Sequence, residues 1–439
     1  MTTFTSYDEE RLMNKLRWRI VPFIFLLYII SMVDRVNISF AALEMNKDLG
    51  ITATAFGAVA GIFFIPYFLF EIPSNILMHR IGARIWISRI MISWGIVVVL
   101  TAFIKNVTHL AVLRCLLGIA EAGFYPSMIL YLTFWFPQKH QARTVSVFMT
   151  GLAAANIITG PVTSWILDNV NWLGLPGWRW VFILEGLPAI ILGILTLFVL
   201  VDRPQQARFL TKEEKEWLVT ELRKEHEAKV AKVNISKWEV LKNGVVWQLT
   251  ISYLGYVMAL YGLGLWLPQI IKALSGYLSN TQIGLISTLP YICGVIGMVL
   301  VANHSDKTME RRFHVGLPII MAAVGLVALT KTKNLVLSMA LISISTVGIY
   351  SYVGSFWTLP NTFLSEETAA VGIALINAFG NLGGFVGPYI VGFLKDATNS
   401  INAGMYVLAS CALIACILAV ALPKKHIMRE GMKTTSKAM

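Results

Sequence analysis

The sequence predicts an all-α integral membrane protein, with twelve transmembrane helices arranged as two pseudo-symmetric six-helix bundles. Two observations lead to this fold class. Hydrophobic residues make up 56% of the chain and charged residues only 14%, against roughly 25% charged residues in soluble proteins. Apolar runs of about 20 residues, the length that crosses a bilayer as a helix, recur along most of the chain.

Each apolar run is predicted to be a helix, because backbone polar groups in lipid must form their hydrogen bonds within the membrane-crossing segment. The runs do not alternate in the way that β-barrel strands do. The predicted spans are 20–43, 54–78, 85–104, 109–132, 144–167, 179–201, 247–271, 282–303, 313–330, 334–359, 369–394 and 401–422.

A charged segment separates the sixth span from the seventh. Within it, Thr211 and Glu214 form a capping box ahead of a Lys/Glu-rich stretch, which predicts a linker helix outside the membrane. We therefore expect three parts: an N-terminal bundle (1–201), a cytoplasmic linker (202–246), and a C-terminal bundle with its tail (247–439).

Short basic turns follow the second and the eighth spans at matching places. The first turn holds Arg80 and Arg84, and the second holds Asp306 and Lys307. This echo indicates an internal duplication, which is typical of carriers whose two halves rock around one site.

The distribution of basic residues predicts the orientation in the membrane. Most of the 36 Lys and Arg residues lie in connections on the side of the N-terminus, so both termini are expected in the cytoplasm. The same rule accounts for the net charge of +12, and no nucleic-acid partner is expected. Residues 1–19 lack the apolar stretch of a cleaved signal, so we expect a multi-pass protein of the inner (plasma) membrane.

The sequence carries no recognisable enzyme or metal motif. Walker A, HExxH and GxSxG patterns are absent, and the four cysteines lie in apolar runs without a CxxC pair. We expect no enzyme activity, no metal site and no cofactor, with protons as the coupling ion. The expected partners are the lipid bilayer and a small organic anion, and the chain is expected to be monomeric.

Charges inside the predicted spans and away from their ends occur only in the first half. Because a charge at mid-bilayer is costly, it marks a functional site by default. These residues are Asp34, Arg35, Glu71, Arg114, Glu121 and Glu185.

Arg35 and Asp34 lie about 22 Å into the first span at 1.5 Å per residue. Arg35 could hold a carboxylate through two hydrogen bonds, and Asp34 could carry a proton. The alternative is a structural ion pair.

Arg114 and Glu121 lie on one face of the fourth span, seven residues apart. Glu121, near the centre of its span, is the best candidate for carrying a proton, with Arg114 as its partner. The alternative is a permanent ion pair that orients the helix. Glu71 could pair with a basic loop residue or take part in transport, and Glu185 is interpreted as structural.

Candidate substrate contacts in the second half are uncharged. Asn377 and Asn381 lie one turn apart on the eleventh span, and Tyr261 lies on the seventh. Their amide and hydroxyl groups could bond substrate hydroxyls, or could serve helix packing and the membrane interface.

Several motifs in order resemble a known family. They are Asp34-Arg35-Val36-Asn37-Ile38, Ile72-Pro73-Ser74-Asn75, Gly82-Ala83-Arg84, Arg114…Gly118…Glu121-Ala122-Gly123, Thr133-Phe134-Trp135-Phe136-Pro137 and His304-Ser305-Asp306-Lys307. The chain resembles the anion:cation symporter family of the major facilitator superfamily, and within it the bacterial tartrate and sugar-acid transporters.

The resemblance implies a role for each matching position. Arg35 would bind substrate, Asp34 and Glu121 would carry protons with Arg114 as partner of Glu121, and Tyr67 would line the substrate site. Asn377 or Asn381 would contact substrate, and the turns with Arg80, Arg84, Asp306 and Lys307 would gate it. His79 departs from the family, which has an acidic residue there.

The predicted function is proton-coupled symport of a small hydroxylated organic anion, such as a tartrate or a sugar acid, into the cytoplasm by alternating access. One alternative is uptake of an aromatic carboxylate such as hydroxyphenylacetate or phthalate, suggested by Tyr67, Tyr261 and Trp266. A second alternative, from a different class, is a membrane sensor that transports nothing.

Overall fold

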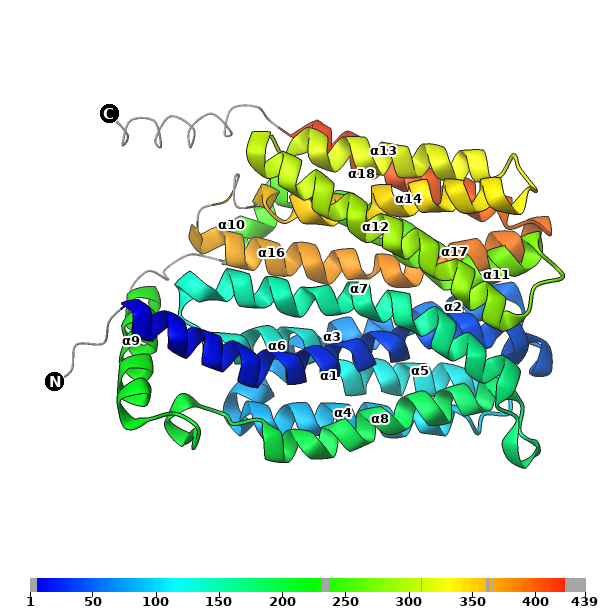
Figure 1. Ribbon diagram of the computed structural model, residues 1–439. Helices are drawn as coiled ribbons and strands as arrows, with labels where there is room; N and C mark the ends of the chain where they lie inside the picture. The colour runs from blue at the N-terminus through cyan, green and yellow to red at the C-terminus, as the bar shows by residue number, and fades with distance from the viewer. Residues whose placement is uncertain (1–5, 231–236, 309, 361–363, 365, 423–439) are drawn as a thin grey trace. The chain divides into compact units, whose positions relative to one another are not determined.

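The computed structural model describes residues 6–230, 237–308, 310–360, 364 and 366–422. Over these residues the chain is helical, without strands, and twelve segments are long and apolar enough to cross a membrane (Figure 1). The predicted all-α class and the twelve spans are confirmed.

The first six spans run from α1 to α8. They are α1 (Ser6–Asp48), α2 (Ala53–Ile62) with α3 (Phe64–Ile81), α4 (Ala83–Thr101), α5 (Val107–Glu121) with α6 (Phe124–Thr133), α7 (Gln138–Asn169) and α8 (Gly177–Val199). A short helix, η1 (Trp172–Gly174), joins α7 to α8.

The second six spans begin after the linker. They are α11 (Gly244–Leu274), α12 (Asn280–Thr308), α13 (Arg312–Leu329), α14 (Leu335–Phe356), α16 (Glu366–Asn381) with α17 (Gly383–Thr398), and α18 (Asn402–Val420). The linker carries η2 (Pro204–Gln206), α9 (Lys212–Val230) and α10 (Lys237–Lys242).

The linker helix α9 starts at the predicted capping box. The backbone N–H of Thr211 donates to Glu214 Oε2 at 2.8 Å, and the N–H of Glu214 donates to Thr211 Oγ1 at 3.2 Å. This reciprocal pair satisfies two donors that a helix start leaves open. The helix then runs across the ends of α1 and α7 (Figure 1).

Three spans are interrupted rather than continuous. The second breaks at Phe63, the fourth at Ala122 and Gly123, and the eleventh at Leu382. Gly123 adopts φ +81°, where an added Cβ would lie 2.5 Å from Ser74 Oγ. Only glycine adopts this conformation freely, so the break in the fourth span is built into the sequence.

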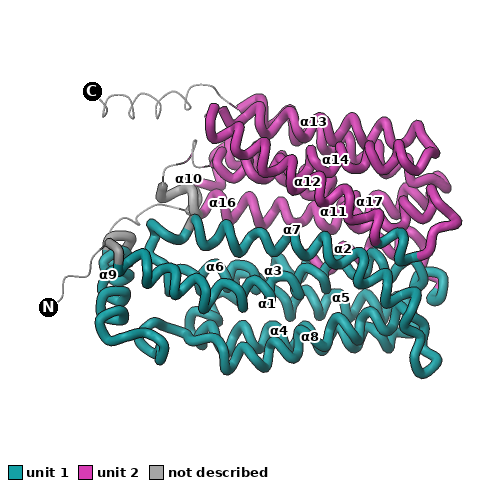
Figure 2. The backbone as a smooth tube through the Cα atoms, in the orientation of Figure 1, with its two compact units in different colours: residues 1–49, 65–233, 280–284 teal, residues 50–64, 234–279, 285–439 magenta. Residues whose placement is uncertain are grey.

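The chain forms two compact units (Figure 2). Unit 1 comprises 1–49, 65–233 and 280–284, and within it α4 packs along α8 and α1 along α7. Unit 2 comprises the remaining residues, and within it α13 packs on α14 and α18, and α2 on α17. The expected domain limits (1–201, 202–246 and 247–439) follow chain order and stay a prediction.

Two helix starts are capped in the same way, one in each unit. In unit 2, Asp396 accepts the backbone N–H of Thr54 at 2.7 Å, in the first turn of α2. In unit 1, Asp168 accepts the N–H of Thr281 at 2.6 Å, in the first turn of α12. The sequence separation from Asp168 to Asp396 nearly equals that from Thr54 to Thr281, as the predicted internal duplication requires.

Candidate functional site

Glu121 and Arg35 form a buried ion pair in unit 1. Arg35 Nη2 donates to Glu121 Oε1, and Ser31 Oγ donates to the same oxygen at 3.1 Å. The Glu121 side chain is 1% exposed, whereas the Arg35 side chain keeps 13%. The guanidinium therefore holds the buried carboxylate while a part of it stays accessible.

The local fold gives Glu121 an unusual place. It is the last residue of α5, two residues before the left-handed Gly123 that begins α6. The C-terminus of a helix carries partial negative charge, which disfavours a carboxylate there. The guanidinium of Arg35 offsets that repulsion.

Asp34 is held by neutral donors. Trp94 Nε1 donates to Asp34 Oδ2 at 2.7 Å, and Asn37 Nδ2 lies 3.5 Å from Oδ1. Asp34 is 2% exposed, and within the described part of the chain it makes no ion pair. A buried carboxyl without a salt-bridge partner is a suitable place to take up a proton.

Arg114, the predicted partner of Glu121, is buried in α5 at 3% exposure. Its charge interacts with the carboxyl groups of both Glu121 and Asp34. The guanidinium that forms the salt bridge with Glu121 is nevertheless that of Arg35. The structure therefore places one guanidinium in direct contact with Glu121 and a second close to both acids.

Glu185 joins α8 to α7. Its Oε1 accepts a hydrogen bond of 2.6 Å from Thr163 Oγ1 in a buried setting. This contact is consistent with the structural role predicted for Glu185.

Tyr67 lies beside the ion pair. The Arg35 guanidinium carbon sits 5.2 Å from the centre of the Tyr67 ring, and Tyr67 is buried. This is a cation–π contact that fixes the position of the guanidinium from the side. Glu71, one turn further along α3, is half-buried, and its charge also interacts with Arg35.

The second-half candidates lie in unit 2. Tyr261 packs against Phe64 with ring centres 4.4 Å apart. Asn377 and Asn381 occupy the last two turns of α16 and are half-buried. Each amide carries a donor and an acceptor that could bond a ligand.

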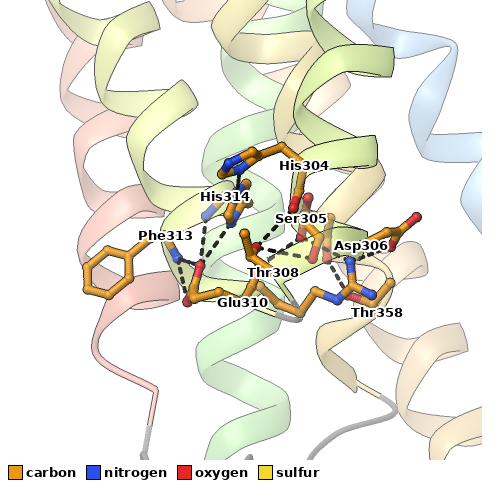
Figure 3. Close-up of polar contacts among 10 residues, drawn as sticks. His304, Ser305, Asp306, Thr308, Glu310, Phe313, His314 and Thr358 are labelled. Carbon is orange, nitrogen blue, oxygen red and sulfur yellow. Dashed lines mark hydrogen bonds and ion pairs between the residues drawn. The ribbon is translucent and has the colours of Figure 1, made fainter.

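The turn after α12 is closed by a network of side chains (Figure 3). Arg311 Nη1 donates to Asp306 Oδ1 at 2.5 Å and to Ser305 Oγ at 3.0 Å. Glu310 accepts the N–H of Phe313 at 2.9 Å and thereby caps α13. Lys307 is exposed.

Two histidines extend this network. His304 Nδ1 and His314 Nε2 are 2.6 Å apart, and His314 Nδ1 is 3.0 Å from Glu310 Oε2 (Figure 3). Burial raises the pKa of Glu310, but the N–H bonds from Phe313 and His314 outweigh burial and lower its pKa below 4.5.

The matching turn after α3 uses a different acid. His79 and Arg80 are exposed, and Gly82 adopts φ +105°. Asp202 Oδ1 accepts the backbone N–H of Arg84 at 2.8 Å. A carboxylate from the start of the linker therefore reaches this turn, although the position of the family's acid holds His79.

Sequence reasoning missed three contributors: Ser31, Trp94 and Asp202. Ser31 lies one turn before Asp34 and Arg35, so its place on their helix face could have been noticed. Trp94 and Asp202 come from distant segments, and no local pattern marks them. No group of three potential metal-binding side chains occurs among the residues that the structure describes.

Comparison with known proteins gives a consistent result. Residues 24–388 match the profile of the Major Facilitator Superfamily. A protein of Agrobacterium vitis, named for tartrate transport, is 45% identical over 95% of each chain. The NicT protein of Pseudomonas putida, named for metabolite transport, is 37% identical over 97% of each.

A solved structure supports the fold. The inward-open xylose transporter XylE from E. coli aligns with a TM-score of 0.74 at 13% identity, over 95% of this chain and 99% of that one. Twelve membrane-crossing helices and these matches define a multi-pass membrane transporter. The chain belongs to the Major Facilitator Superfamily.

Proposed function

We propose that this protein imports a small hydroxylated organic anion, tartrate-like or a sugar acid, together with protons. The observation that carries the proposal is the buried pair between Glu121 and Arg35. One guanidinium serves as the partner of an internal carboxylate, and a substrate carboxylate would compete for the same donors.

This competition couples the two ligands. While Glu121 is ionised, it occupies Arg35. Protonation of Glu121 removes its negative charge and frees the guanidinium, which then binds the substrate carboxylate through paired hydrogen bonds. The bound anion restores the charge balance that the proton changed, so the loaded site avoids an unpaired buried charge.

Asp34 supplies a second candidate proton site. Trp94 and Asn37 can hold either form of its carboxyl group, because their N–H groups donate to an oxygen that remains an acceptor after protonation. Arg114 would favour the ionised form of Glu121 until a proton arrives.

The remaining steps are those of a carrier. We place both termini in the cytoplasm because basic residues concentrate on that side, and we infer alternating access from the paired halves. Asn377, Asn381 and Tyr261 would contact substrate hydroxyls, and the turns with Arg80, Arg84, Asp306 and Lys307 would gate the pathway. The relative named for tartrate transport supports the choice of substrate class.

An aromatic carboxylate is the second candidate substrate. The Tyr67 ring against Arg35 favours it, since an aromatic acid could stack there while its carboxylate meets the guanidinium.

A substrate panel tests the proposal. Purified protein would be placed in separate batches of liposomes, each preloaded with one acid: tartrate, an aldonate, an aldarate, hydroxyphenylacetate or phthalate. Each batch would be exposed to the same acid in labelled form outside, and exchange would be measured. We expect exchange with tartrate or a sugar acid. Exchange with the aromatic acids alone would move the assignment to the second candidate, and no exchange with any acid would contradict transport of organic anions.

A further inference from the structure

A cleft in unit 1 lies apart from the buried charges. It has a volume of about 460 Å³ and is formed by α1, the start of α4, the end of α8 and the segment around η2. Its lining residues are Arg19, Arg84, Leu197 to Val201, Gln206, Arg208 and Phe209. The cleft therefore lies at the ends of three membrane-crossing helices, next to the start of the linker.

The lining carries three positive charges and no negative charge. Arg19, Arg84 and Arg208 are all exposed, and none of their guanidinium groups forms an ion pair with a described residue. Lys15, four residues before Arg19, differs because it pairs with Glu214 at 2.8 Å. The nearby carboxylate of Asp202 is engaged by the backbone N–H of Arg84. The cleft therefore favours an anion.

One wall of the cleft, formed by the end of α8, is apolar and exposed. Phe198 is 79% exposed and Val199 37% exposed. The same outward face of α8 continues through Ile194 and Ile191, which are also exposed. On a membrane-crossing helix such a surface contacts acyl chains. A small hydrophilic anion would gain nothing from this wall.

Two further features fit the membrane interface. The guanidinium carbon of Arg19 lies 5.7 Å from the centre of the Phe209 ring, and both residues line the cleft. Trp18, the preceding residue, is 82% exposed, and tryptophan is enriched at the level of lipid headgroups. Basic pockets between helices at this level bind anionic headgroups.

We propose that this cleft binds an anionic phospholipid, with the phosphodiester on Arg19, Arg84 and Arg208 and an acyl chain along Phe198 and Val199. Bound lipid would bridge α1, the turn before α4 and the linker. The site is independent of the transport proposal, and its test measures lipid and not transport.

The experiment compares lipid retention by three forms of the full-length chain. Wild type, the cleft variant R19Q/R84Q/R208Q and the control variant R11Q/K212Q/R223Q would be reconstituted in phosphatidylcholine with one-tenth phosphatidylglycerol, extracted in mild detergent, and analysed by native mass spectrometry. The control removes three other exposed basic residues that do not line the cleft.

We expect wild type and control to retain phosphatidylglycerol. We expect the amount of phosphatidylglycerol retained by the cleft variant to be at least fivefold lower than that retained by wild type. Equal retention by all three forms would overturn the proposal, as would an equal loss in both variants. If the triple variant does not fold, R208Q alone and F198A alone replace it. Each is expected to retain at least twofold less phosphatidylglycerol than wild type.

A competition arm separates a lipid from a free phosphate. Short-chain phosphatidylglycerol and glycerol 3-phosphate share the phosphate but differ in acyl chains. We expect only the former to displace the retained lipid at millimolar concentration. Displacement by glycerol 3-phosphate at equal potency would show a site for soluble phosphates and would overturn the lipid assignment.

Discussion

At the scale of single residues, the account depends on one carboxylate and one guanidinium that share a bond. Arg35 is held by Glu121 on one side and lies against the ring of Tyr67 on the other. Both contacts orient the guanidinium, but only the first can be removed by a proton. The predictions at this scale therefore concern what each partner does when the other is changed.

Glu121→Gln should separate exchange from accumulation. The amide cannot ionise, so it mimics the protonated carboxyl and leaves Arg35 free for substrate. We expect counterflow of labelled tartrate in liposomes at up to the wild-type rate, with uphill accumulation under an inward pH gradient reduced at least tenfold. Glu185→Gln, which can keep the bond from Thr163, is the control and should retain accumulation. Accumulation by Glu121→Gln at the wild-type level would contradict the coupling role.

Arg35→Lys should weaken substrate binding while keeping the charge. An ammonium cannot reproduce the paired hydrogen bonds of a guanidinium. We expect the Kd for tartrate, measured by calorimetry, to rise at least tenfold, which is about 1.4 kcal/mol. An unchanged Kd in Arg35→Lys would show that the substrate does not meet this guanidinium.

Sequence alone could select these residues but not their pairing. Asp34, Arg35, Arg114 and Glu121 stand out because a charge within an apolar run is visible in the sequence. Which base meets Glu121 depends on how the first and fourth spans face each other, and seven-residue spacing favoured Arg114 instead. Trp94 was missed for the same reason, since tryptophan on an apolar span is ordinary.

At the scale of elements, the broken fourth span places Glu121. Sequence predicts one helix over 109–132, because glycine within an apolar run does not by itself end a helix. The structure ends α5 at Glu121 because Gly123 is left-handed and Ser74 lies against it. The break is a tertiary effect, and the spacing of apolar residues does not reveal it.

Gly123→Ala should therefore destabilise the protein. A side chain in the left-handed region costs about 1–2 kcal/mol, and the Cβ would also press on Ser74. We expect a lower Tm in detergent, measured by the fluorescence of the tryptophans. Gly264→Ala is the control, because the nearest atom to its Cβ would lie at 3.7 Å. If both variants melt at the wild-type temperature, the break does not constrain the fold.

The turn after α12 should respond to pH through Glu310. Because its pKa is lowered in the folded state, ionised Glu310 contributes stability above its ordinary pKa of 4.5, and that contribution is lost as pH falls through the folded pKa. We expect the Tm difference between wild type and Glu310→Gln to be largest near pH 6 and to shrink below pH 4.5. A difference that grows on acidification would reverse the assigned sign.

At the scale of the whole molecule, sequence was sufficient for the class and the span count. Hydropathy alone requires the twelve crossings, since apolar runs of this length have no other stable form in lipid. Hydropathy does not predict which residues belong to each compact unit. Residues 50–64 and 280–284 belong to the unit opposite to their chain neighbours. In each case an aspartate of that unit, Asp396 or Asp168, accepts a backbone N–H at the helix start.

The energetics of the whole molecule set a limit on transport. A pH difference of one unit is worth about 1.4 kcal/mol per proton, so it supports at most about tenfold accumulation for each coupled proton. If the number of protons equals the number of negative charges on the anion, no net charge crosses the membrane and uptake does not depend on the membrane potential. If more protons than that enter with each anion, uptake depends on the potential.

If substrate and proton enter together, substrate entry acidifies the lumen of a proteoliposome, and the luminal pH reports it. Liposomes containing wild type and a trapped pH-sensitive dye, with equal pH on both sides, would receive tartrate or the aldonate that the panel selects. The account predicts acidification of the lumen that follows substrate entry in wild type and is absent in Glu121→Gln. Entry of labelled substrate into wild-type liposomes without any acidification would contradict it.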